Sequence, residues 1–137
     1  MTRFVDTNVL LYSISTAPDE AAKRARAISI IEGGDLTLSV QVLQEFYVQA
    51  TRATRSERIE PELALGLVQA WSRFEVVEGT LALMLRAAEM SQRHRIGYWD
   101  AAIVATASEA GCDQLLTEDL QHGQVIDGVR IVDPFVA

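Results

Sequence analysis

The sequence is poor in cysteine and lysine and has no long apolar run. Its single cysteine, Cys112, excludes an internal disulfide, and without a CxxC pattern it argues against a zinc site or a redox pair. We expect Cys112 to be buried as a small apolar side chain. No segment approaches the roughly 20 uninterrupted apolar residues of a membrane span, and the first residues lead into a strand rather than a signal peptide. These absences favour a cytoplasmic protein without a membrane span.

Positive charge is also scarce. The chain has 12 Lys and Arg against 19 Asp and Glu, a net charge of −7. This balance disfavours sequence-independent binding to nucleic acid, because such binding depends on neutralisation of the phosphates. Lys23 is the only lysine, and the other basic residues are arginines, which suit forked phosphate contacts and ordinary ion pairs alike. With 137 residues, 49% of them hydrophobic, the chain fits one compact domain over residues 1–137.

Short strand-like segments alternate with longer helical segments along the whole chain. The segments expected to form strands are residues 3–6, 36–39, 74–77, 114–117 and 129–132. The segments expected to form helices are residues 7–15, 19–33, 40–54, 61–71, 80–95 and 99–111. This alternation predicts an α/β fold in which helices cover both faces of a mainly parallel sheet.

The spacing of apolar residues predicts which side chains of the helices are buried. In the second helix the expected core stripe consists of Ala21, Ala22, Ala25, Ile28 and Ile31. In the third helix it consists of Leu43, Phe46, Tyr47 and Ala50.

Two acidic residues, Asp6 and Asp119, follow strand-like segments. In an open parallel sheet ligands bind at the carboxyl ends of the strands, so both carboxylates are expected to face the functional crevice. The alternative for Asp6 is that it only caps the helix that follows. Glu118 precedes Asp119 directly, and because neighbouring side chains diverge we expect one of this pair to face the crevice. We favour Asp119 because of its distance from the strand end, and Glu118 remains the alternative.

Two further acids lie on helical segments with apolar surroundings. Glu45 has Val42 and Val48 three residues to either side, so its own face of the helix is partly apolar. Asp100 begins a helix whose next eight residues, 101–108, carry no charge, so we expect this helix to be buried on most sides. The helix dipole supports a carboxylate in the first turn by about 1 kcal/mol or less at an exposed end, whereas an unpaired buried carboxylate costs several. Asp100 therefore needs a further partner.

If these four acids converge, their mutual repulsion is relieved by a hard divalent cation. Mg²⁺ prefers oxygen ligands and keeps several waters, so two or three carboxylates would suffice, with Asn8 or Thr117 as minor polar partners. The sequence has no His or Cys cluster that would favour a softer metal. A cation held in this way can activate water and stabilise charge on a phosphate oxygen, which suits the hydrolysis of phosphodiesters.

The motifs that carry these residues resemble the PIN-domain ribonuclease family, and within it the VapC-type toxins of bacterial toxin–antitoxin pairs. The resemblance rests on the order and placement of several short segments: residues 4–12, the helix of Glu45, residues 98–105, residues 115–120 and residues 133–135. It implies a three-layer α/β/α sandwich and an endoribonuclease that depends on Mg²⁺ or Mn²⁺ and leaves 5′-phosphate and 3′-hydroxyl ends. It also implies a homodimer that a VapB-type antitoxin inhibits.

The resemblance assigns the role of metal ligand to Asp6, Glu45, Asp100 and Asp119, with Asn8 and Thr117 as supporting polar groups. Contact with RNA is a further hypothesis, for which the candidates are Arg52, Arg55, Arg93 and Arg95, although surface ion pairs are the favoured explanation for such arginines. The alternative function is a non-catalytic module of the same fold that binds RNA or protein and whose acids are structural.

Overall fold

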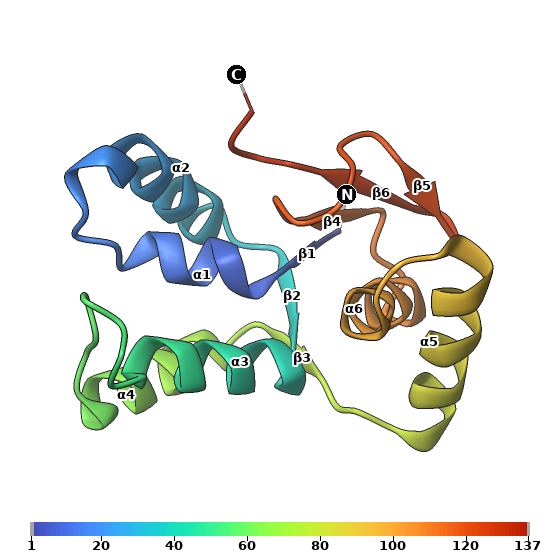
Figure 1. Ribbon diagram of the computed structural model, residues 1–137, viewed down its shortest axis with the longest axis horizontal. Coiled ribbons are helices and arrows are strands. Elements are labelled where there is room, and N and C mark those ends of the chain that lie inside the picture. Colours follow the sequence, from blue (N-terminus) through green and yellow to red (C-terminus); the bar gives the residue numbers. More distant parts are fainter. Residues whose placement is uncertain (1, 137) are drawn as a thin grey trace.

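The computed structural model describes residues 2–136, which form one six-stranded sheet, six α-helices and a short 3-10 helix (Figure 1). The strands are β1 (Arg3–Val5), β2 (Leu36–Ser39), β3 (Glu75–Val77), β4 (Gln114–Leu116), β5 (Val125–Ile126) and β6 (Val129–Val132). The helices are α1 (Thr7–Ser13), η1 (Pro18–Glu20), α2 (Ala21–Glu32), α3 (Val40–Thr51), α4 (Pro61–Trp71), α5 (Leu81–His94) and α6 (Tyr98–Glu109). Within this range no helix has the length and apolar character needed to cross a membrane.

The sheet has the strand order β3-β2-β1-β4-β6-β5, and all neighbours are parallel except β5 and β6. The chain first builds the sheet outward from β1 through β2 to β3, and then returns to add β4 on the other side of β1. The order therefore reverses between β1 and β4, and at such a switch point the two connections leave a crevice at the carboxyl ends of the strands. This arrangement confirms the predicted, mainly parallel α/β fold.

Helices flank the sheet on two sides. In Figure 1, α1 to α4 lie to the left of β1 and β2, whereas α5 and α6 lie to the right. Helix α1 packs against α2 and α3, helix α3 also packs against α4, and α5 packs against α6. The α1–α3 contact brings the side chains that follow β1 and β2 close to one another.

Burial confirms part of the predicted core and corrects the rest. Phe46 and Trp71 are buried with their ring centroids 4.7 Å apart, and Cys112 is buried as expected. Tyr47 was predicted in the core but is 38% exposed, because it lies at the edge of the face of α3 that Val42, Leu43, Phe46 and Ala50 bury. The predicted core stripe of α2 is also wrong, because only Ile31 of its members is buried. The buried residues of this helix are Ala27, Ile30 and Ile31. The second half of α2 thus makes the core contacts.

The ends of several elements differ from the prediction. Helix α1 ends at Ser13 and α3 at Thr51, each before the residue expected from the sequence. Strand β6 was predicted, but β5 and the hairpin that it forms with β6 were not. Its turn residues Asp127 and Gly128 have φ values of 48° and 79°, which suits the tight hairpin turn that an Asp-Gly pair favours. That pair between two apolar segments was the signal available in the sequence.

Candidate active site

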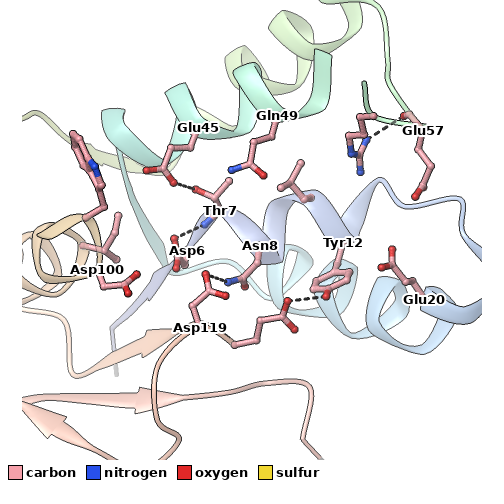
Figure 2. Close-up of a pocket in the computed structure, with 15 residues that line it drawn as sticks. Asp6, Thr7, Asn8, Tyr12, Glu20, Glu45, Gln49, Glu57, Asp100 and Asp119 are labelled. Carbon is pink, nitrogen blue, oxygen red and sulfur yellow. Dashed lines mark hydrogen bonds between the residues drawn. The ribbon is translucent and has the colours of Figure 1, made fainter. Parts of the chain in front are cut away.

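A cavity of about 420 Å³ lies at the carboxyl ends of β1 and β4. Its walls come from α1, α3, the loop after α3, the start of α6 and the segment after β4. The four acids predicted from the sequence all line it, together with three more carboxylates and one arginine. The seven acids are Asp6, Glu20, Glu45, Glu57, Asp100, Glu118 and Asp119, and the arginine is Arg55. Figure 2 shows Asp6, Glu45, Asp100 and Asp119 gathered in one part of this cavity.

Asp6 is the most deeply buried of these acids, with 7% of its surface exposed. Its position is fixed because β1 pairs with β4 immediately before it, and its own backbone N–H donates to the carbonyl of Leu116. Oδ1 accepts a hydrogen bond from the backbone N–H of Thr7 at 2.7 Å, and Oδ2 accepts one from the hydroxyl of Thr117 at 2.8 Å. One oxygen therefore caps α1, while the other is held toward β4.

Burial raises the pKa of Asp6 to about 6. The hydrogen bonds from Thr117 and Thr7 counteract this shift, and the negative charges of Asp119 and Glu45 add to it. A carboxylate that is both buried and surrounded by like charge favours the protonated form unless a cation is present. Desolvation is thus the main cause, and the mutual repulsion that the sequence suggested for converging acids contributes less.

Asn8 and Thr117 connect Asp6 to Asp119. The amide nitrogen of Asn8 donates to Thr117 Oγ1 at 3.1 Å and to Asp119 Oδ2 at 3.2 Å. Thr117 Oγ1 also accepts from the backbone N–H of Asp119 at 3.1 Å. The remaining polar atom of this network, Asn8 Oδ1, is buried and has no hydrogen-bond partner among the described residues. This oxygen is therefore unsatisfied in a side chain whose amide nitrogen donates to Asp119.

Glu45 reaches the same region from α3. Its Oε2 accepts from the hydroxyl of Thr7 at 3.1 Å, and its Oε1 accepts from the side chain of Gln41 at 3.1 Å. Thr7 thus bonds to both Asp6 and Glu45, the first through its backbone and the second through its hydroxyl. The contact between α1 and α3 in this way brings a mid-helix carboxylate next to the end of β1.

Asp100 stands at the first turn of α6, after which every residue from 101 to 107 is buried. Desolvation raises its pKa, and the charges of Asp119 and Glu45 raise it further. Within residues 2–136 no hydrogen bond or ion pair compensates this carboxylate. The structure therefore leaves Asp100 without the further partner that the sequence argument requires.

Glu118 and Asp119 have different surroundings. Glu118 accepts from the hydroxyl of Tyr12 at 2.7 Å and pairs with Lys23 at 3.2 Å. Asp119 has no basic partner within the described range; its charge instead acts on Asp6 and Asp100. The charge of Glu118 is therefore balanced by Lys23, whereas Asp119 belongs to the cluster of unpaired acids.

The four candidate RNA-binding arginines are not brought together. Arg52, Arg93 and Arg95 are exposed and do not line the cavity. Arg93 pairs instead with Glu89 at 2.8 Å. Arg55 is half-buried, lines the cavity, and donates from Nη1 to the backbone carbonyl of Glu57 at 3.1 Å.

The donor set suits a hard cation, because it consists of carboxylate, hydroxyl and amide oxygens with no thiol or imidazole in the cavity lining. The unpaired carboxylate of Asp100 and the unsatisfied Asn8 Oδ1 fit the same conclusion. Over residues 2–136, however, no three acidic, His or Cys side chains are arranged closely enough to form a ready-made metal site. Without a cation the acids repel one another, and hydrogen bonds from Thr7, Asn8 and Thr117 hold three of them in separate positions.

The family profile described as PIN domain matches residues 3–126. The chain therefore belongs to the PIN domain family. Comparison with curated protein sequences gives no match.

Several solved structures share this fold. One is the Mycobacterium tuberculosis toxin VapC20, described as cleaving the sarcin-ricin loop, with a TM-score of 0.69 and 19% identity over 86% of this chain and 92% of that one. A second is a toxin–antitoxin complex from Klebsiella pneumoniae, with a TM-score of 0.70 and 22% identity over 98% of both chains. A third is DNA-bound VapBC from Salmonella typhimurium, with a TM-score of 0.66 and 22% identity over 98% of both chains.

Proposed function

We propose that this protein is a divalent-metal-dependent endoribonuclease and the toxin of a VapBC-type toxin–antitoxin pair. The observation that carries the proposal is the convergence of Asp6, Glu45, Asp100 and Asp119 on one cavity, with no lysine or arginine paired to any of them among the described residues. Membership of the PIN family and the toxin structures of the same fold support the nuclease assignment. The whole chain, residues 1–137, would form the nuclease domain.

Asp6, Asp100 and Asp119 would hold Mg²⁺ or Mn²⁺ through their carboxylate oxygens, and Glu45 would complete or orient this set. A bound ion of this kind supplies an activated water and offsets the charge that develops on the phosphate oxygens during hydrolysis. Thr117 would orient Asp6, since its hydroxyl bonds Oδ2, and Asn8 would orient Asp119.

Arg55 would bind a phosphate of the RNA. It is the arginine of the cavity lining, and its bond to the carbonyl of Glu57 leaves the rest of its guanidinium free for the forked phosphate contact that this side chain favours. Arg52, Arg93 and Arg95 would serve as secondary contacts outside the cavity. The products would carry 5′-phosphate and 3′-hydroxyl ends.

The protein would act in the cytoplasm as a homodimer whose activity a VapB-type antitoxin suppresses. Structures of the same fold include toxin–antitoxin complexes and DNA-bound VapBC, and these support the choice of partner. Mass spectrometry of material purified from its own host would test this choice, because a stoichiometric small protein is expected to accompany the chain.

The nuclease function is tested by incubating the purified protein with end-labelled RNA in Mg²⁺ or Mn²⁺, and then in EDTA. We expect cleavage that EDTA abolishes and that Asp6→Asn reduces by at least about 100-fold, the scale set by removal of one catalytic electrostatic group. Asp19→Asn, an exposed acid outside the cavity, serves as the control and should leave the rate unchanged. Cleavage that persists in EDTA, or in a folded Asp6→Asn protein, would contradict the metal-dependent function.

A further inference from the structure

An exposed tryptophan stands at the mouth of the acidic cavity. Trp99 is the second residue of α6 and precedes Asp100 directly, and 66% of its surface is exposed although it lines the cavity. Isolated exposed apolar residues are common on protein surfaces and need no special reason. Trp99 differs because it lines the cavity in which the substrate of this site would lie.

The neighbouring tyrosine anchors this indole. The rings of Tyr98 and Trp99 meet edge-to-face, with centroids 5.0 Å apart and an angle of 78° between their planes. Tyr98 is partly buried and packs against the hydrophobic core. The start of α6 therefore holds Trp99 against a fixed neighbour while most of its surface stays open to solvent.

Trp99 and Arg55 lie at opposite ends of the cavity. Figure 2 places Asp100 at one end of the row of lining residues and Glu57 at the other. Trp99 adjoins Asp100 in the chain, and Arg55 bonds to the carbonyl of Glu57. An RNA strand that crosses the cavity would meet an aromatic surface, then the cluster of carboxylates, and then an arginine.

We propose that the indole of Trp99 stacks on an unpaired nucleobase next to the phosphate that is cut, and so positions the RNA strand over the carboxylates of the cavity. A base within a duplex has both faces covered by its neighbours, so an indole can stack only on a base that is unpaired or terminal. Stacking is also tolerant of sequence, because every base has an aromatic face. This inference rests on the proposed ribonuclease function and adds a residue that binds its substrate.

The first test uses the fluorescence of Trp99. The chain has two tryptophans, and the other, Trp71, is buried against Phe46, so a Trp71→Phe protein reports on Trp99 alone. In a background that also carries Asp6→Asn to prevent cleavage, an unpaired oligoribonucleotide with Mg²⁺ should quench the emission and protect it from iodide. The same strand annealed to its complement should do neither at equal concentration.

The second test is kinetic. On a single-stranded substrate Trp99→Leu should raise KM roughly 5- to 150-fold, the range expected for loss of one base–aromatic stack, with a smaller change in kcat. Trp99→Phe should restore most of the loss because it keeps an aromatic face. Leu85→Ala, which removes an exposed apolar side chain outside the cavity, should leave both constants unchanged.

The outcomes separate this inference from the nuclease function. If the wild-type protein does not cut RNA in Mg²⁺ or Mn²⁺, the nuclease function itself fails. If the wild type cuts but Trp99→Leu keeps the same KM, or duplex protects Trp99 as well as single strand does, the stacking inference is overturned and the nuclease function stands. Loss of the dimer in Trp99→Leu at unchanged KM would likewise overturn it and assign the indole to a protein contact.

Discussion

In the absence of a divalent cation, Asp6→Asn should stabilise the protein at pH 7, even though the same substitution should reduce cleavage in Mg²⁺ by at least about 100-fold. Burial raises the pKa of Asp6 from its ordinary value of 3.8 to about 6 in the folded protein. Between these two values the folded state keeps the proton that the unfolded state has lost. Stability should therefore fall as pH rises from about 4 to about 6, the direction that linkage requires when the native state binds more protons.

The magnitude follows from the same shift. One pKa unit corresponds to 1.36 kcal/mol. Ionisation of the buried Asp6 should therefore lower the free energy of unfolding by about 3 kcal/mol at pH 7. The asparagine keeps one acceptor for the Thr7 N–H but loses the acceptor oxygen toward Thr117. The lost hydrogen bond should reduce the gain in stability by about 1 kcal/mol. The net gain from Asp6→Asn in EDTA should be about 2 kcal/mol.

A divalent cation should reverse the order of the two proteins. A ligand at 100 times its Kd stabilises the state that binds it by about 2.7 kcal/mol. Mg²⁺ should therefore stabilise the wild type by this amount and should stabilise the Asp6→Asn protein much less, because that variant lacks the most buried of the proposed ligands.

The assay is urea denaturation at fixed protein concentration, from pH 4 to pH 7, with EDTA or with saturating Mg²⁺. Asp19→Asn is the matched control, because it changes an exposed acid outside the cavity. If Asp6→Asn is less stable than the wild type in EDTA at pH 7, or if the pH dependence is the same in both, then the buried carboxylate does not carry the cost assigned to it and the reasoning is wrong.

Three further predictions follow from the contacts of individual side chains. Asp119→Asn should lower kcat in Mg²⁺ by at least about 100-fold, whereas Glu118→Gln should change it less than about 10-fold, because Glu118 is already paired with a lysine; single-turnover cleavage compares the two. Arg55→Ala should raise KM about 10-fold and reduce the salt slope of RNA binding by about 1, while Arg93→Ala should do neither, as titrations at several salt concentrations would show. Phe46→Ala should lower the free energy of unfolding by about 3–5 kcal/mol, measured by urea denaturation, because the ring is fully buried.

The sequence predicted the parts of the site that depend on chain-local patterns. Asp6 follows a strand and begins a helix, and both assignments rest on a few consecutive residues. The uncharged helix after Asp100 is equally local, and its burial from 101 to 107 agrees with the prediction. Consecutive residues are sufficient to predict these elements, because a buried strand or helix consists mainly of apolar residues.

The parts that were wrong or left open depend on contacts between distant segments. Tyr47 has the same helical spacing as a core residue, and only the packing of α3 on its neighbours decides which edge of the apolar stripe is covered. The choice between Glu118 and Asp119 depends on Tyr12 and Lys23, which lie 106 and 95 residues away from Glu118. The sequence marks Trp99 only as the start of a helix. No pattern in the neighbouring residues predicts that its side chain is exposed and lines a cavity.

The composition of the cavity explains why an aromatic surface suits an RNA-binding site in this protein. Seven carboxylates and one arginine line it, and the whole chain carries a net charge of −7, so the field at the site repels phosphate. A divalent cation would relieve that repulsion at the point of cleavage, but not along the rest of the strand. Stacking on Trp99 depends on no charge, so it would hold a nucleotide where further arginines would form ion pairs with the acids that are proposed to bind the metal.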